Sequence, residues 1–95
     1  MSARSHYNER RMTQVGKEVA SERWRQECAV QTAKIPWDCA DPCVSDDAKL
    51  AVLGEEFGEV ARALIEGDGL RRELIHVAAV AVAWAESLSA ARVAE

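Results

Sequence analysis

The stretch GEEFGEVARALIEGDGLRRELIHVAAVAVAWA, residues 54–85, decides the fold of this chain. Its apolar residues recur every three or four positions on both sides of Gly67, a spacing that is typical of amphipathic helices. Gly67 is a favourable residue for ending the helix before it, and the next helical pattern begins at about residue 69. A connection this short forces the two helices to run antiparallel. The stretch therefore predicts an antiparallel helical hairpin, with helices over residues 46–66 and 69–88.

The residues before the hairpin predict one more helix and a loop. Apolar side chains recur at helical spacing among many charges over residues 8–33. The segment 34–45, KIPWDCADPCVS, contains two prolines and several turn formers, and its last residue, Ser45, is a good N-cap for the next helix. We therefore expect one all-α domain over residues 1–95, made of an N-terminal helix and a helical hairpin.

The composition excludes several classes of protein. The chain has 12 basic and 16 acidic residues and a net charge of -4, whereas a nucleic-acid-binding surface needs a basic patch. No apolar run is as long as a membrane span, and the polar N-terminus does not look like a signal peptide. Three cysteines are an odd number, which suits free thiols in a reducing compartment. We expect a cytoplasmic protein.

The hairpin has more apolar surface than the rest of a 95-residue chain can bury. Eleven of the twelve residues from Leu74 to Ala85 are apolar, and His76 is the exception. The preceding helix carries an apolar stripe that we expect to face the core: Leu50, Leu53, Phe57, Val60 and Leu64. A helix that is apolar nearly all round must be covered on every side. A partner subunit is therefore expected, giving a four-helix-bundle-like core on oligomerisation.

The acidic residues of the hairpin fall into facing pairs. Residue 66 is the midpoint between Glu59 and Glu73, and also between Glu56 and His76. It lies within about a residue of the turn, so the members of each pair should lie side by side in an antiparallel hairpin. Glu55 points away from this spot at about 100° per residue.

Two interpretations of these acids remain open on periodicity alone. Clustered, half-buried carboxylates repel one another, and a divalent cation such as Mg²⁺ or Mn²⁺ would relieve that repulsion. Alternatively, the glutamates turn to the surface and pair with Arg62, Arg71 and Arg72, because charge runs usually form solvated faces.

A resemblance favours the metal interpretation. EEFGEV (55–60) followed by ELIH (73–76) resembles the Glu-Glu-x-x-Glu and Glu-x-x-Asp signature of the MazG-like all-α nucleoside triphosphate pyrophosphohydrolases. The similarity extends over residues 49–88. It implies hydrolysis of a nucleoside triphosphate to the monophosphate and pyrophosphate, often to clear unwanted nucleotides, and it implies Mg²⁺ and a homodimer or dimer of dimers.

Carried over residue by residue, the resemblance defines a catalytic site. Glu56, Glu59 and Glu73 take the positions of metal ligands, and Glu55 matches the leading acid of the motif. His76 stands where the family usually has an aspartate. This departure leaves the fourth ligand, and the activity that depends on it, open.

The remaining candidates concern the substrate. Arg71 and Arg72 are placed to neutralise a triphosphate, although a solvated helix start is the simpler explanation for at least one of them. Lys34 and Trp37, in the loop, are candidates for phosphate contact and base stacking. Trp37 is equally well explained as a hydrophobic plug over the end of the bundle.

Two rival functions stay open. Glu-x-x-His on an inward face also occurs in ferritin-like di-iron bundles, which need two such motifs, and a symmetric dimer of this chain would present two. The second rival is a non-catalytic nucleotide-binding or interaction protein, in which loss of the aspartate has ended turnover.

Overall fold

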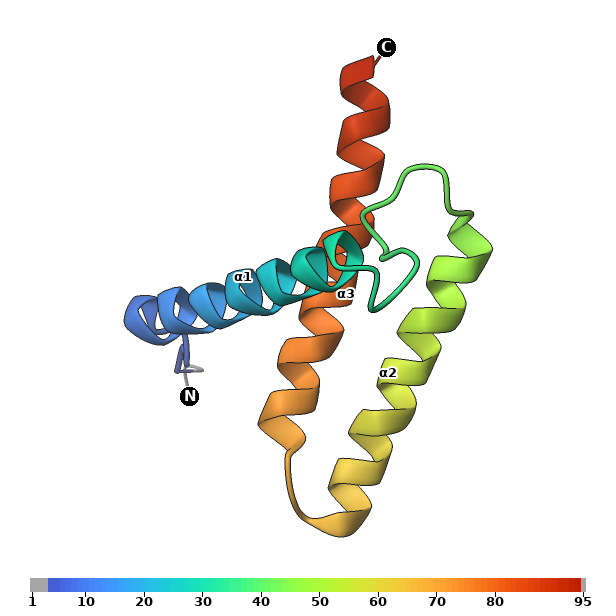
Figure 1. Cartoon of the computed structure of the whole chain (residues 1–95). Coiled ribbons are helices and arrows are strands. Elements are labelled where there is room, and N and C mark those ends of the chain that lie inside the picture. Colours follow the sequence, from blue (N-terminus) through green and yellow to red (C-terminus); the bar gives the residue numbers. More distant parts are fainter. Residues whose placement is uncertain (1–3, 95) are drawn as a thin grey trace.

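The computed structural model describes residues 4–94, with side chains for residues 4–89. It contains three helices, α1 (Glu9–Gln31), α2 (Asp46–Glu66) and α3 (Leu70–Ala94), and no strand within residues 4–94 (Figure 1). The prediction of an all-α fold is confirmed. Within the same residues, none of the helices combines the length and the apolar character that crossing a bilayer requires.

Helix α1 begins and ends close to the predicted limits of 8–33. The side chain of Asn8 caps its N-terminus by accepting a hydrogen bond of 2.9 Å from the backbone N–H of Arg11. The helix ends at Gln31, two residues earlier than predicted. Ala33 adopts the left-handed conformation, with φ at 58°, which stops the helix although its side chain makes this conformation unfavourable.

The caps of the hairpin explain the limits of α2. Ser45 accepts a hydrogen bond from the backbone N–H of Ala48 at 3.2 Å, as expected of an N-cap. Gly67 ends the helix in the left-handed conformation, with φ at 75°, and donates its N–H to the carbonyl of Ala63. The predicted span of 46–66 therefore matches the structure.

Helix α3 is longer than the predicted span of 69–88. It begins at Leu70, directly after Gly69, and continues to Ala94. The segment 86–94, ESLSAARVA, contains neither Gly nor Pro and several strong helix formers, so nothing local ends the helix near residue 88.

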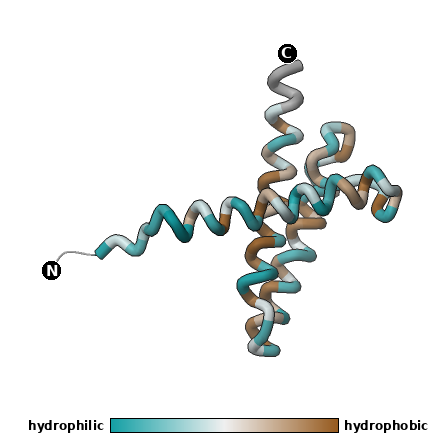
Figure 2. The backbone as a smooth tube through the Cα atoms, turned by 60° about the vertical axis from the view of Figure 1, so that its left-hand side comes forward, coloured by the Kyte–Doolittle hydropathy of each residue, from teal (hydrophilic) through white to brown (hydrophobic). Residues whose placement is uncertain are grey.

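Helix α3 packs against both other helices. It runs antiparallel to α2 in the hairpin, and α1 crosses it, with the N-terminal part of α1 projecting beyond the hairpin (Figure 1). Hydrophobic residues gather where α1 crosses, while the N-terminal half of α1 is mostly hydrophilic (Figure 2). Arg23 ties this crossing together, because it contacts Asp38 in the loop at 3.2 Å and Glu86 on α3 at 3.0 Å.

The core is small and lies near the start of α2. Cys39, Val80 and Ala83 form its buried centre, and Trp37 and Trp84 pack against them. The three cysteines, Cys28, Cys39 and Cys43, are free thiols, and burial raises the pKa of Cys39.

Two polar contacts hold α2 and α3 together beside this core. The buried Lys49 donates to the hydroxyl of Ser87 at 2.8 Å, and the Trp84 indole N–H donates to Asp46 at 2.8 Å. The Lys49–Ser87 hydrogen bond is buried and therefore costly to break, so it fixes the register of the hairpin, whereas the Trp84–Asp46 hydrogen bond is exposed.

The prediction that the leucine stripe of α2 faces the core holds only in part for this chain alone. Leu53 packs against the core and Val60 is half-buried, but the other three members are exposed. Leu50, Phe57 and Leu64 are 58%, 58% and 63% exposed. The hairpin turns the neighbouring stripe towards α3 instead, and Lys49 and Ala63 are its fully buried members. Because both stripes contain apolar residues, helical periodicity by itself does not select between them.

Further apolar side chains are exposed on α1 and α3. Met12 and Trp24 of α1 border an apolar groove of about 770 Å³, whose other wall includes Ala78 and Val82 of α3. Leu74 is also half-exposed, whereas Ala79, Val80 and Ala83 are buried. The chain by itself thus covers only part of the apolar surface of α3.

Candidate metal centre

The hairpin brings three potential metal ligands together. Glu56 of α2 and Glu73 and His76 of α3 each offer a ligand atom, and these atoms lie within 4.8 Å of one another. The Nδ1 atom of His76 is 3.4 Å from a carboxylate oxygen of Glu73, one helical turn away. The juxtaposition of Glu56 with His76, which the equal distance of the two residues from the turn predicts, is confirmed.

The ionised form of Glu56 is disfavoured by burial and by the neighbouring acids. Burial raises the pKa of this carboxyl group, and the neighbouring carboxylates Glu73, Glu59 and Glu22 raise it further, while His76 acts in the opposite direction. An acid whose pKa is raised is held in an unfavourable state when it is ionised at neutral pH. A cation bound here would remove that cost.

Helix α1 contributes a residue that the sequence analysis missed. Glu22 is only 9% exposed, and its Oε1 atom is 3.8 Å from Nε2 of His76. Arg25 forms a bidentate ion pair with it, at 2.6 Å and 2.7 Å, which lowers the pKa of Glu22 although burial acts against this. The imidazole therefore lies between two carboxylates, one from its own helix and one from α1.

A signal for Glu22 is present in the sequence. Val15, Val19, Glu22 and Gln26 follow the spacing of a single helix face, and all four are buried or half-buried. An acid within an otherwise inward-facing stripe is a candidate for a specific partner. That partner is on α3, so its identity became evident only when the crossing of α1 and α3 was known.

The other two acids of the motif lie outside the three-residue group. Glu55 is exposed, as its angular position on the helix predicts. Glu59 borders the group, with its side chain about half exposed, and contacts Arg62 of its own helix at 3.7 Å. Glu56 and Glu73 thus converge, as the metal interpretation expects, whereas Glu59 contacts Arg62 and Glu73 also contacts Arg72, as the surface interpretation expects.

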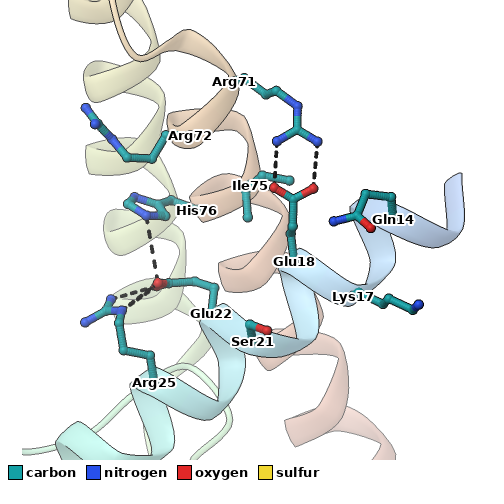
Figure 3. A pocket seen from close by; sticks show the side chains of 10 residues that line it. All are labelled: Gln14, Lys17, Glu18, Ser21, Glu22, Arg25, Arg71, Arg72, Ile75 and His76. Atoms are coloured by element: carbon teal, nitrogen blue, oxygen red, sulfur yellow. Dashed lines mark hydrogen bonds and ion pairs between the residues drawn. The ribbon is translucent and has the colours of Figure 1, made fainter. Parts of the chain in front are cut away.

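Arg71 and Arg72 lie at the rim of a polar cleft beside the metal group. The cleft, of about 450 Å³, lies between α1 and the first turns of α3 and is called the α1–α3 cleft here (Figure 3). His76 and Glu22 form part of its wall. Arg71 makes two hydrogen bonds with Glu18 of α1, at 2.6 Å and 2.7 Å, and Arg72 contacts Glu73 at 3.4 Å.

The loop candidates lie elsewhere. Lys34 is exposed and does not line the cleft, and Trp37 packs against the core, as the plug interpretation predicts. Trp37 also lines an apolar cavity of about 360 Å³ together with Val52 and Val80. Arg25 borders both this cavity and the α1–α3 cleft, so the two hollows are neighbours.

A scan against protein-family models finds no match to this chain, and searches among curated proteins and solved structures find none either. The functional argument therefore rests on the chemistry of the residues themselves. Two carboxylates and an imidazole suit a divalent cation that accepts both oxygen and nitrogen ligands, and Mn²⁺ accepts imidazole more readily than Mg²⁺ does.

Proposed function

We propose that the chain is a metal-dependent nucleoside triphosphate pyrophosphohydrolase, which releases a nucleoside monophosphate and pyrophosphate. The observation that carries the proposal is the convergence of Glu56, Glu73 and His76, with ligand atoms within 4.8 Å of one another. The resemblance of EEFGEV and ELIH to the MazG-like signature supports the same reaction. Clearing unwanted nucleotides from the cytoplasmic pool is the role that this chemistry would serve.

The residues fit hydrolysis of a phosphoanhydride. A bound Mg²⁺ or Mn²⁺ would neutralise phosphate charge and lower the pKa of a water molecule. Glu56 and Glu73 would hold the cation, and Glu59 would exchange its ion pair with Arg62 for the metal. Glu55 matches the leading acid of the motif, but it is exposed and lies outside the group, so we assign it no step. A carboxylate of the centre that does not hold the cation would accept a proton from water.

His76 distinguishes this centre from one made of carboxylates alone. Its Nδ1 atom lies 3.4 Å from Glu73 and its Nε2 atom 3.8 Å from Glu22. We assign His76 a supporting role, in which it holds the glutamates or contacts a phosphate, because an imidazole is a poor ligand for Mg²⁺. A second candidate function, a Glu-x-x-His centre for iron, is favoured by the same imidazole and would be identified by iron in the purified protein.

We also propose that the active form is a homodimer or a dimer of dimers. The exposed stripe of α2, with Phe57 at its centre, and the apolar groove between α1 and α3 support this proposal. Contiguous apolar surfaces of this kind are typical of interfaces. Light scattering at micromolar concentration measures the oligomer, and a stable, well-folded monomer would contradict the proposal.

The test of the activity is pyrophosphate release from a panel of canonical and modified nucleoside triphosphates, with Mg²⁺ and with Mn²⁺. We expect turnover that requires the metal and that is lost in Glu73→Gln. The matched control is Glu66→Gln, which removes the same charge from an exposed position at the end of α2. Nucleotide binding without pyrophosphate release would identify a non-catalytic binding protein instead.

A further inference from the structure

The α1–α3 cleft has a charge opposite to that of the whole protein. Four cationic side chains border it, Lys17, Arg25, Arg71 and Arg72, against two carboxylates, Glu18 and Glu22. This is an excess of two positive charges in a chain whose net charge is -4. Glu73, which contacts Arg72 from beside the cleft, offsets one of these charges. The positive charge that remains in excess attracts ions of the opposite sign, so the cleft favours anions.

Each carboxylate in the cleft is already neutralised by an arginine. Arg25 pairs with Glu22, and Arg71 pairs with Glu18 across the two helices (Figure 3). The first pair is anchored, because Glu22 is only 9% exposed. The second is open to solvent, since the side chains of Arg71 and Glu18 are 63% and 33% exposed. Arg25 is itself 67% exposed, but its departure would leave the buried Glu22 carboxylate unpaired, so the second pair changes partners at the lower cost.

The Glu18 carboxylate occupies the position on Arg71 that a phosphate group would take. Its two oxygens meet two guanidinium nitrogens, the same forked arrangement that an arginine forms with a phosphate. Exposed ion pairs contribute little to stability, so exchanging Glu18 for a more highly charged phosphate costs the fold little. The hydrogen bonds from Arg71 also lower the pKa of Glu18, which stabilises the ionised form of this competitor.

We infer that the α1–α3 cleft binds the phosphate chain of its ligand, and that Arg71 exchanges Glu18 for a phosphate group when the chain enters. His76 lines the same cleft and belongs to the metal group, so a phosphate chain here lies beside the candidate metal. The role of the bound chain as a substrate rests on the proposed function, whereas its binding does not.

The test measures binding of inorganic tripolyphosphate to the full chain by calorimetry, with the metal removed by a chelator. Arg71→Gln should weaken binding at least about tenfold, the loss expected when a charge-assisted hydrogen bond is removed. Glu18→Gln should strengthen binding several-fold, because the internal competitor is gone. Arg10→Gln is the control, since it removes the same charge from an exposed part of α1 outside the cleft.

Several results would overturn the inference: no binding of tripolyphosphate by the wild type, an unchanged affinity in Arg71→Gln, or an equal loss in Arg10→Gln. A gain of affinity in Glu18→Gln cannot come from misfolding, so this variant keeps the test decisive if Arg71→Gln is unstable. Nucleoside triphosphates and monophosphates, run beside tripolyphosphate, separate recognition of the chain from recognition of the nucleoside. Binding of tripolyphosphate without pyrophosphate release would support the inference and contradict the proposed function. Pyrophosphate release that is unchanged in Arg71→Gln and Glu18→Gln would support the proposed function and contradict the inference.

Discussion

Replacing Glu56 by glutamine should stabilise the metal-free protein and abolish its stabilisation by metal. Glu56 is the carboxyl group whose pKa burial and the neighbouring acids raise, so its ionised form opposes folding at neutral pH. Glutamine keeps the size of the side chain and removes the charge. If Glu56→Gln makes the protein more stable, Glu56 is not there to stabilise the fold, and a functional role explains it better.

The distances in the cluster set the size of the effect. Two unit charges at 4.8 Å, the limit within which the ligand atoms of Glu56 and Glu73 lie, repel by about 3.5 kcal/mol at an effective dielectric constant of about 20 and by about 0.9 kcal/mol in water. Because Glu56 is half-buried and His76 offsets part of the repulsion, we expect a gain of about 1–2 kcal/mol. For a domain of this size, each kcal/mol raises the melting temperature by about 4–8 °C.

The assay is thermal unfolding at pH 8, with a chelator and then with Mg²⁺ or Mn²⁺. Wild type should gain about 2.7 kcal/mol when the metal is at about 100 times its dissociation constant, and Glu56→Gln should gain little. The order of stability of the two proteins should therefore reverse when metal is added. A raised pKa penalises folding above the folded-state pKa and ceases to do so below the ordinary value of glutamate, so the advantage of the variant should fade as the pH falls.

Glu55→Gln is the control, because it removes the same charge from the adjacent, exposed position. If Glu55→Gln stabilises the protein as much as Glu56→Gln does, the effect comes from the net charge of the chain and not from the cluster. A metal-free Glu56→Gln that is less stable than the wild type would refute the reasoning outright, since it would mean that Glu56 makes a net favourable contact.

Three further predictions concern the metal preference, the backbone and the oligomer. His76→Asp should tighten binding of Mg²⁺ relative to Mn²⁺, because the change replaces a nitrogen ligand by an oxygen ligand, and pyrophosphate release should be preserved or raised. Calorimetry with both ions measures the change in affinity. Loss of Mg²⁺-dependent activity in a folded variant would mean that the imidazole has a role that aspartate cannot fill. Ala33→Gly should stabilise the protein by about 0.5–1 kcal/mol in denaturant unfolding, because glycine adopts φ of 58° without steric cost; a destabilised variant would show that the chain relaxes there. Phe57→Glu should convert the proposed dimer to a monomer in light scattering, since the Phe57 side chain is 58% exposed on the isolated chain. If the wild type is a dimer and the variant has the same mass, the interface lies elsewhere.

The sequence by itself determined the helices, the hairpin and part of the candidate site. Apolar periodicity and the caps Ser45 and Gly67 are local features, so they specify where α2 lies regardless of what packs on it. The short turn then couples the two helices, which is why Glu56 and His76 could be paired by their equal distance from it. Chain connectivity alone carries this information over about twenty residues.

Only the tertiary structure decided how the helices are rotated and what α1 contributes. Two stripes of α2 are apolar enough to be buried, and the packing of the hairpin selects the one that contains Glu56 and leaves Phe57 outside. The contacts of Glu22 with His76 and of Glu18 with Arg71 join residues more than fifty positions apart in the chain. Such contacts depend on the crossing of α1 and α3, which is set by side-chain packing between the two helices and has no counterpart in the periodicity of either one.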